Sequence, residues 1–167
     1  MPEKRWVFDA VTLCNFLLSG STRILEKRYR RRSVIRSQVF DEISAGIREH
    51  RELNRLHTLI ANGSFRMVSL SAPEMKRYQT LIGHLGKGEA SSIAYARGRN
   101  VIVVTDDRAA RAQCSRMRIS FTGTIGILAA SVQDRQIHLA QADAILRKMI
   151  QAGFYSPVRS ISDIAGS

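Results

Sequence analysis

The sequence predicts an α/β domain with a mostly parallel central sheet. Short apolar runs of strand length alternate along the chain with longer segments whose apolar residues recur at helical spacing. The four β-branched residues at 101–104 are typical of a central parallel strand that is buried on both faces. The chain has 167 residues and no visible internal repeat, which favours a single domain, expected at residues 1–155.

The expected strands and helices alternate in order along the chain. Strands are expected at 6–8, 33–36, 65–70, 101–104 and 119–121. Helices are expected at 11–18, 38–47, 52–61, 73–82, 89–97, 109–117, 125–132 and 139–152. Ser37 is expected to cap the second helix, Pro73 suits a first helical turn, and Gly153 marks the end of the last helix. Residues 156–167 are rich in Ser and Gly, so we expect a flexible C-terminal tail there.

The chain carries a large excess of positive charge, with 26 Lys and Arg residues against 14 Asp and Glu and a formal net charge of +12. Such an excess indicates a polyanionic partner, which is a nucleic acid, an acidic protein or both. No apolar run reaches the ~18 residues of a membrane span, and the start of the sequence does not read as a signal peptide. We therefore expect a cytoplasmic protein with no membrane partner.

The two cysteines, Cys14 and Cys114, lie far apart in the sequence, each within a pattern of apolar or small residues. We interpret them as buried thiols, because a reducing compartment disfavours a disulfide. Neither the cysteines nor the four histidines have neighbours at the spacing of zinc ligands. The pattern therefore disfavours a zinc site.

Several acidic residues lie at the ends of expected strands and helices. They are Asp9 after the first strand, Glu42 in the helix at 38–47, Glu89 at a helix start, and Asp106 and Asp107 after the strand at 101–104. Because parallel strands bring their carboxyl ends to one edge of the sheet, where α/β proteins bind ligands, we expect these acids to converge. Converging carboxylates repel one another unless a cation joins them, and Mg²⁺ takes such oxygen ligands. The pattern predicts a metal-dependent enzyme that acts on phosphodiesters.

Each acid also has a purely structural interpretation. Asp106 or Asp107 suits the N-cap of the helix at 109–117, Glu89 suits a first helical turn, and Glu42 suits an exposed helix position. Asp9 is harder to explain in this way, because an acid that ends an apolar strand is costly to bury without partners. The metal-site hypothesis therefore rests on the acids taken together.

Three stretches of the sequence resemble the PIN-domain nucleases. They are FDAVTLCNFL at 8–17, LGKGEASSIA at 85–94 and VVTDDRAAR at 103–111. Two later stretches, TGTIGIL at 122–128 and AGF at 152–154, are similar to one bacterial and archaeal branch of that family. The motifs are short, and the resemblance depends on their order and spacing between about Trp6 and Phe154.

The resemblance implies a three-layer α/β/α sandwich and a ribonuclease site that uses one or two Mg²⁺ or Mn²⁺ ions. Asp9, Glu42 and Glu89 match the first three catalytic carboxylates of the family. The fourth is Asp107 by the usual family spacing, or Asp106 by the branch with paired aspartates. The metal ligands implied are Asp9, Glu89 and one or both of Asp106 and Asp107.

The polar residues around the first acid depart from the family pattern. Ala10 follows Asp9, where many family members have a small polar residue. Thr12 is the nearest polar group that could hold a carboxylate or a metal-bound water, and Thr105 is a second supporting residue. Asn15 lies six residues after Asp9, so simple helical periodicity does not place it on the same face.

Basic residues suggest where RNA binds. Residues 23–36 contain seven positively charged side chains and one negative one. We interpret part of this run as a track for the RNA backbone beside the acids, with a solvated helix face or loop as the alternative. A second group follows or adjoins the acids and is expected to hold the scissile phosphate. The RNA-binding candidates are Arg28, Arg30, Arg31, Arg32, Lys87, Arg108 and Arg111.

The resulting hypothesis is a metal-dependent endoribonuclease with RNA as its substrate. The resemblance to VapC-type toxins implies the toxin of a type II toxin–antitoxin pair, an acidic antitoxin as a partner, and a homodimer. The alternative is a non-catalytic nucleic-acid-binding or regulatory protein on a PIN scaffold. Cleavage of DNA or flap structures is a third interpretation, which the chain supports less because it shows no additional arch or hairpin element.

Overall fold

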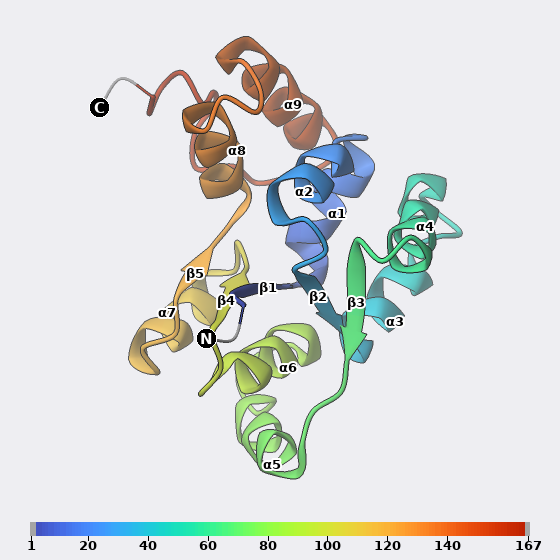
Figure 1. Ribbon diagram of the computed structural model, residues 1–167, viewed down its shortest axis with the longest axis vertical. Helices are drawn as coiled ribbons and strands as arrows, with labels where there is room; N and C mark the ends of the chain where they lie inside the picture. Colours follow the sequence, from blue (N-terminus) through green and yellow to red (C-terminus); the bar gives the residue numbers. More distant parts are fainter. Residues whose placement is uncertain (1–2, 166–167) are drawn as a thin grey trace.

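Figure 1 shows the computed structural model, which describes residues 3–165. Within that range, five parallel strands form one sheet in the order β3-β2-β1-β4-β5. The strands are β1 (Arg5–Phe8), β2 (Ser33–Arg36), β3 (Phe65–Val68), β4 (Val101–Val104) and β5 (Phe121–Thr122). Strand β1 is central, with Val7 opposite Val34 on one side and Val103 on the other. The predicted α/β fold with a parallel sheet is confirmed.

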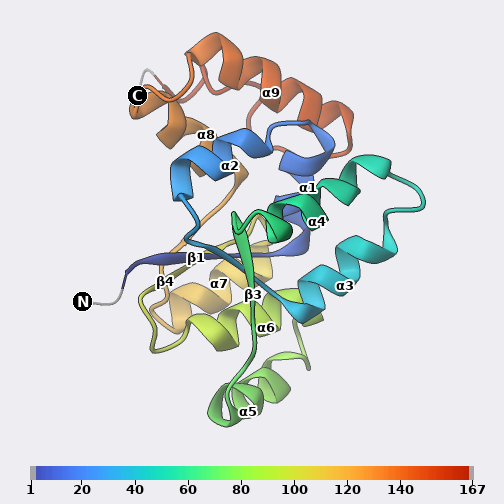
Figure 2. The same cartoon turned by 45° about the vertical axis from the view of Figure 1, so that its right-hand side comes forward.

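Helices cover both faces of the sheet and produce the three-layer sandwich (Figures 1 and 2). One face packs against α1 (Ala10–Leu18), α2 (Thr22–Tyr29), α3 (Ser37–Ala45), the 3₁₀ helix η1 (Arg51–Asn54), α4 (Arg55–Ala61), α8 (Thr124–Gln133) and α9 (Leu139–Gln151). The other face packs against α5 (Ala72–Leu81), α6 (Lys87–Ala96) and α7 (Arg108–Arg116). Side chains alternate along a strand, so Val7 and Phe8 enter different cores.

The parallel strands give the sheet two chemically distinct edges. We call the edge at Phe8, Arg36 and Val104, where β1, β2 and β4 end, the carboxyl edge. The opposite edge, where these strands begin, is the amino edge. Figure 2 shows β1 running toward the start of α1 and β2 running toward α3. Residues that follow the strands therefore meet at the carboxyl edge.

The five predicted strands are present within two residues of their expected bounds. Helix α2 has no counterpart among the predicted elements, because its Arg-rich sequence conceals an apolar face formed by Ile24, Leu25 and Tyr29. The helix predicted at 52–61 begins with the 3₁₀ turn η1. Ser37 is the first residue of α3 instead of its cap, and Arg36 occupies the N-cap position.

The segment after α9 packs against the protein, unlike the flexible tail expected for residues 156–167. Gly153 follows α9 with a φ of 110°, which favours glycine, and Phe154 then packs into the core. Ile161 is 0% exposed, and the backbone N–H groups of Ile161 and Ser162 donate to Asp143 of α9 at 2.6 and 3.1 Å. The Ser-rich composition conceals these anchors. The last two residues of the chain lie outside the described range.

Both cysteines are free thiols, as expected from the sequence. Cys114 is buried and Cys14 is half-buried. Burial raises the pKa of each thiol to about 11, and the negative charges of Glu42 and Asp9 add to the effect at Cys14. Both are therefore protonated and weakly nucleophilic at neutral pH.

Among the helices formed by residues 3–165, none is both long enough and apolar enough to span a membrane.

We predict that Ile161→Ala lowers the free energy of unfolding by about 2–4 kcal/mol, because it leaves a cavity between the C-terminal segment and the core. Urea denaturation followed by circular dichroism measures the change. Ile150→Ala is the control, since Ile150 lies on α9 and is 38% exposed; we expect its effect to stay within about 1 kcal/mol. Equal stability of Ile161→Ala and the wild type would contradict an anchored C-terminal segment.

Candidate active site at the carboxyl edge of the sheet

Asp9 follows β1 and carries a buried carboxylate. It is the N-cap of α1, and its Oδ1 accepts a hydrogen bond from the backbone N–H of Thr12 at 2.8 Å. The side chain is 0% exposed, and Oδ2 has no hydrogen-bond partner among the described residues. Burial raises the pKa of Asp9 to about 7, opposed by the hydroxyls of Thr105 and Thr12 and assisted by the charge of Asp106. Because an unpaired buried oxygen is costly, Oδ2 favours a proton or a cation.

Asp106 follows β4 and is held by donors from three helices. From α8, the Thr124 backbone N–H donates to Oδ1 at 2.8 Å and the Thr124 hydroxyl donates to Oδ2 at 2.5 Å. From α1, the hydroxyl of Thr12 and the amide of Asn15 donate to Oδ2 at 3.2 and 3.3 Å. From α7, the guanidinium of Arg111 lies 3.8 Å from Oδ1. These contacts fix the direction of the Asp106 carboxylate.

Asp107 has a different role from its neighbour Asp106. It is the N-cap of α7, and its Oδ1 accepts a hydrogen bond from the backbone N–H of Ala110 at 2.7 Å. Its own N–H donates to the hydroxyl of Thr105 at 3.1 Å, and its side chain is exposed. Of the two aspartates, the geometry favours Asp106 as the partner of Asp9 and Asp107 as a helix cap.

Two polar residues that orient Asp106, Asn15 and Thr124, are absent from the predicted site, whereas Thr12 is part of it. Asn15 is 7% exposed and donates from Nδ2 to Asp106 and, at 3.0 Å, to the hydroxyl of Thr124. Helical periodicity separates Asn15 from Asp9, but the residue that Asn15 contacts is Asp106. Thr12 and Asn15 stand at i and i+3 on α1, which places both on one helix face. This buried polar pair in an otherwise apolar helix was the available signal.

The acids Glu42 and Glu89 lie together at the start of α6. Glu42 is exposed in the second turn of α3, and its Oε2 approaches Gly88 so closely that a β-carbon there would lie 3.3 Å away. Glu89 is in the first turn of α6, with its carboxylate against the N-cap residue Gly86. The positive end of the α6 dipole favours both negative charges. Although Glu42 is exposed, partial desolvation of its carboxylate and the charge of Glu89 raise the pKa of Glu42 above its ordinary value.

The predicted acids form two pairs and not one compact cluster. Across residues 3–165, no three Asp, Glu, Cys or His side chains lie close enough to hold one metal ion together. Cys14 of α1 is electrostatically linked to both pairs, because the charges of Glu42 and Asp9 each raise its pKa. The carboxyl edge thus carries Asp9 with Asp106 and, separately, Glu42 with Glu89.

The first pair fits a hard divalent cation. Mg²⁺ usually takes one or two protein carboxylates and completes its coordination with water and substrate phosphates. Asp9 and Asp106 supply two neighbouring carboxylates, and Oδ2 of Asp9 accepts no hydrogen bond among the described residues, although the hydroxyls of Thr105 and Thr12 lie near enough to lower the pKa of Asp9. A cation would also offset the repulsion through which Asp106 raises the pKa of Asp9. The donor set therefore matches the chemistry of Mg²⁺ or Mn²⁺.

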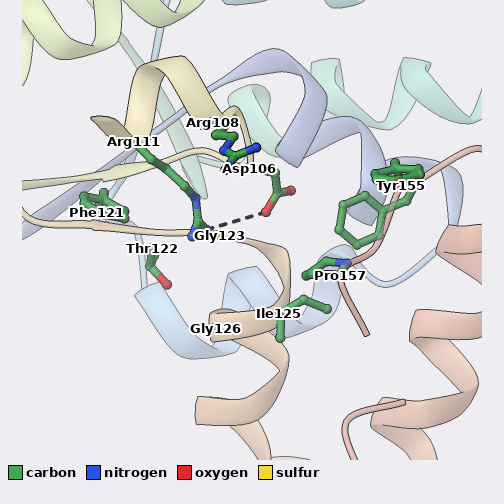
Figure 3. Close-up of a pocket in the computed structure, with 11 residues that line it drawn as sticks. Asp106, Arg108, Arg111, Phe121, Thr122, Gly123, Ile125, Gly126, Tyr155 and Pro157 are labelled. Atoms are coloured by element: carbon green, nitrogen blue, oxygen red, sulfur yellow. Dashed lines mark ion pairs between the residues drawn. The ribbon is translucent and has the colours of Figure 1, made fainter. Parts of the chain in front are cut away.

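A pocket with cationic side chains opens beside each acid pair. The pocket next to Asp106 has a volume of ≈ 670 Å³ and is lined by Arg108 and Arg111 of α7 (Figure 3). The pocket next to Glu89 has a volume of ≈ 690 Å³ and is lined by Lys87. The three cations expected to hold the scissile phosphate thus lie beside the acids.

The basic run at 28–32 lies at the amino edge, contrary to its expected position beside the acids. Arg32 directly precedes β2, and its carbonyl accepts a hydrogen bond from the N–H of Trp6 at 3.0 Å. Trp6 stands near the beginning of β1, whereas Asp9 follows its other end. The sequence distance between the run and the acids gave no information on which edge each occupies.

Parts of this run are engaged within the protein. Arg28 forms an ion pair with Asp134 at 2.7 Å, and the guanidinium of Arg32 lies 4.9 Å from the ring centre of Trp6. Arg30 and Arg31 form the exposed turn after α2 with φ values of 41° and 67°. The expectation that this basic run lies beside the acids is therefore wrong, while RNA binding by its residues stays a prediction.

We predict that Asp9→Asn stabilises the metal-free protein at alkaline pH. Because the pKa of Asp9 is raised from 3.8 to about 7, its contribution to stability is complete below 3.8 and is lost as the pH rises through about 7. Asn removes the charge and retains an N-cap acceptor for α1. In EDTA, we expect a higher melting temperature for Asp9→Asn than for the wild type at about pH 8, and a smaller difference at about pH 5.

Asp107→Asn is the control for this measurement, because it makes the same change at an exposed N-cap. We expect its effect to be small at both pH values. A stabilisation by Asp9→Asn that does not vary with pH would contradict the ionisation of a buried carboxylate as its cause.

A family model described as DUF3368: PIN domain matches residues 5–166. No match was found among curated proteins or among solved structures. The matched range includes the whole parallel sheet and both acid pairs at its carboxyl edge. The chain therefore belongs to the PIN-domain family, whose members are generally nucleases.

Proposed function

We propose that this protein is an endoribonuclease that requires Mg²⁺ or Mn²⁺ and hydrolyses phosphodiester bonds in RNA. The observation that carries the proposal is the pairing of Asp9 with Asp106 in a PIN domain. One carboxylate is buried with an unpaired oxygen, and the other is fixed by hydrogen bonds. The net charge of +12 supports a polyanionic substrate.

In this proposal, Asp9 and Asp106 are ligands of one ion, and Glu89 with Glu42 would hold a second. A bound divalent ion supplies positive charge to the transition state of hydrolysis and lowers the pKa of the attacking water. Thr12, Asn15 and Thr124 keep the Asp106 carboxylate in one orientation.

Arg108, Arg111 and Lys87 are the proposed ligands of the RNA phosphates. Arg111 is already oriented, because its Nε donates to the carbonyl of Thr105 at 2.8 Å. Arg108 is exposed at the first position of α7, where the helix dipole also favours an anion. These Arg and Lys side chains would thus bind the phosphates of the substrate next to the carboxylates, independently of its base sequence.

We also propose that the protein is the toxin of a type II toxin–antitoxin pair whose antitoxin is acidic. The exposed turn of Arg30 and Arg31 at the amino edge supports a partner of negative charge. Its separation from the acids suits a protein partner that does not compete for the metal ligands. The homodimer implied by the family resemblance stays a prediction.

A second candidate function is RNA binding without cleavage. The observation that favours it is the arrangement of the acids, since no three metal-ligating side chains in the described part of the chain lie within reach of one ion. A metal-dependent nuclease with two carboxylates per ion and a non-catalytic binding protein differ in whether cleavage follows the addition of Mg²⁺ or Mn²⁺.

We predict that Asp9→Asn and Asp106→Asn each reduce RNA cleavage by at least about 100-fold, because each removes a metal ligand. Asp107→Asn is the matched control and should retain most of the activity, since Asn also caps a helix. Cleavage of end-labelled RNA is followed in Mg²⁺, in Mn²⁺ and in EDTA. Expression of the wild type, and not of Asp9→Asn, should arrest bacterial growth if the protein is a toxin.

The outcomes separate the candidates. Cleavage that persists in EDTA or in Asp9→Asn would overturn the metal-dependent mechanism. RNA binding without cleavage in either metal would favour the non-catalytic candidate. A loss of activity in Asp107→Asn with normal activity in Asp106→Asn would reverse the assignment of the two aspartates.

We predict that the double variant Arg108→Gln/Lys87→Gln binds single-stranded RNA with a weaker salt dependence. Each lost phosphate contact should reduce the slope of log K against log salt by about 0.7, or about 1.4 for the pair. Filter binding in EDTA across a range of salt concentrations measures the slope. Arg116→Gln at the far end of α7 is the control. An equal change in slope for each removed charge would indicate an effect of net charge and not of phosphate contacts.

A further inference from the structure

The pocket beside Asp106 combines two kinds of surface. It lies between the start of α7, the loop from β5 to α8 and the segment at 154–157, and its volume is ≈ 670 Å³. Figure 3 shows Arg111 and Phe121 on one side and Tyr155 and Pro157 on the other, with Asp106 between them. The pocket thus offers guanidinium groups near the acid and aromatic or aliphatic groups farther away. A nucleotide presents two surfaces that complement these, a phosphate for the guanidinium groups and a flat base for the aromatic ring.

Tyr155 is exposed to an unusual degree for an aromatic residue. It is 95% exposed, whereas the preceding residue Phe154 is 9% exposed and packs into the core. The backbone N–H of Phe154 donates to the carbonyl of Met149 at 2.9 Å, which ties the segment to α9. Ile161 anchors the chain again a few residues later. Tyr155 is therefore presented to solvent by a segment that is fixed on both sides.

The opposite side of the pocket is also fixed. The guanidinium of Arg111 lies 5.3 Å from the ring centre of Phe121, and its Nε donates to the carbonyl of Thr105. Gly123 leaves the necessary space, because a β-carbon at this position would collide with Arg111 and Asp106. The positive group is thus held next to the proposed catalytic acid and faces a pocket large enough for a ligand.

We propose that this pocket is the binding subsite for an unpaired nucleotide of single-stranded RNA, next to the bond that is cleaved. The base stacks on Tyr155, and Arg108 and Arg111 hold the adjoining phosphate. Stacking on an aromatic ring requires a base that is not inside a duplex, so the subsite selects single-stranded RNA. The assignment rests on the proposed ribonuclease function for the position of the cleaved bond.

The test measures binding apart from cleavage. A short single-stranded RNA containing 2-aminopurine is titrated with wild type, Tyr155→Ala and Tyr155→Phe in EDTA. We expect binding by the wild type and Tyr155→Phe to lower the 2-aminopurine fluorescence through stacking. Tyr155→Ala should lose this change and bind roughly tenfold more weakly. The same RNA in duplex form should bind the three proteins equally.

Two controls keep the result specific. The melting temperature of Tyr155→Ala should equal that of the wild type, because the side chain is 95% exposed. Arg116→Gln should leave the fluorescence change intact. An unchanged affinity and fluorescence change in Tyr155→Ala would overturn the proposal, as would an equal loss in Tyr155→Phe. The first result would point to a different occupant of the pocket, such as an apolar side chain of a protein partner, and the second to a contact of the Tyr155 hydroxyl in place of stacking.

Failure of the subsite and failure of the ribonuclease function are distinguishable. If the wild type binds RNA with the fluorescence change but does not cleave it in Mg²⁺ or Mn²⁺, the nucleotide-binding pocket stands and the ribonuclease proposal falls. If cleavage depends on Asp9 and binding does not depend on Tyr155, the ribonuclease proposal stands and the subsite falls.

Discussion

Asp9 has a carboxylate that is buried at the end of the central strand, and only one of its two oxygens is hydrogen-bonded within the described protein. An ionised group in such a place loses several kcal/mol of hydration, which the fold must offset. The start of α1 offsets part of this cost through the N–H of Thr12 and the helix dipole. The remaining oxygen is left for a proton or a cation. The chemistry of the site therefore depends on this one residue at the end of the central strand.

Asp106 differs from Asp9, because both of its oxygens accept hydrogen bonds from neighbouring helices. Its hydrogen bonds connect the end of β4 with α1 and α8, and Arg111 adds a charge from α7. Elements that are distant in sequence are thus locked around one carboxylate. Gly123 belongs to the same arrangement, since only a residue without a β-carbon leaves room for the Asp106 and Arg111 side chains. The stability of this part of the fold and the orientation of the acid cannot be varied independently.

The sequence was sufficient for the sheet and for the acids that follow its strands. The β-branched run of β4 and the acids after β1 and β4 are local signals, and parallel pairing carries them to a common edge. Asn15 and Thr124 could not be assigned in the same way, because their partner Asp106 lies 91 and 18 residues away. The C-terminal anchors were hidden for a related reason. Ile161 lies in a Ser-rich segment with Val158 and Ile164 three residues to either side, and its burial depends on packing next to α9.

The short strands have a consequence for the electric field around the molecule. Four residues at about 3.3 Å each separate the basic turn at the amino edge from the acids at the carboxyl edge by about 13 Å. This separation exceeds the Debye length of about 8 Å at physiological ionic strength. The surrounding ions therefore shield the two edges from each other, and the acids do not cancel the attraction of the arginines for a polyanion. In dilute salt the Debye length grows to about 30 Å at 0.01 M, so the shielding weakens and a polyanion would experience the net charge of the whole protein as a single field.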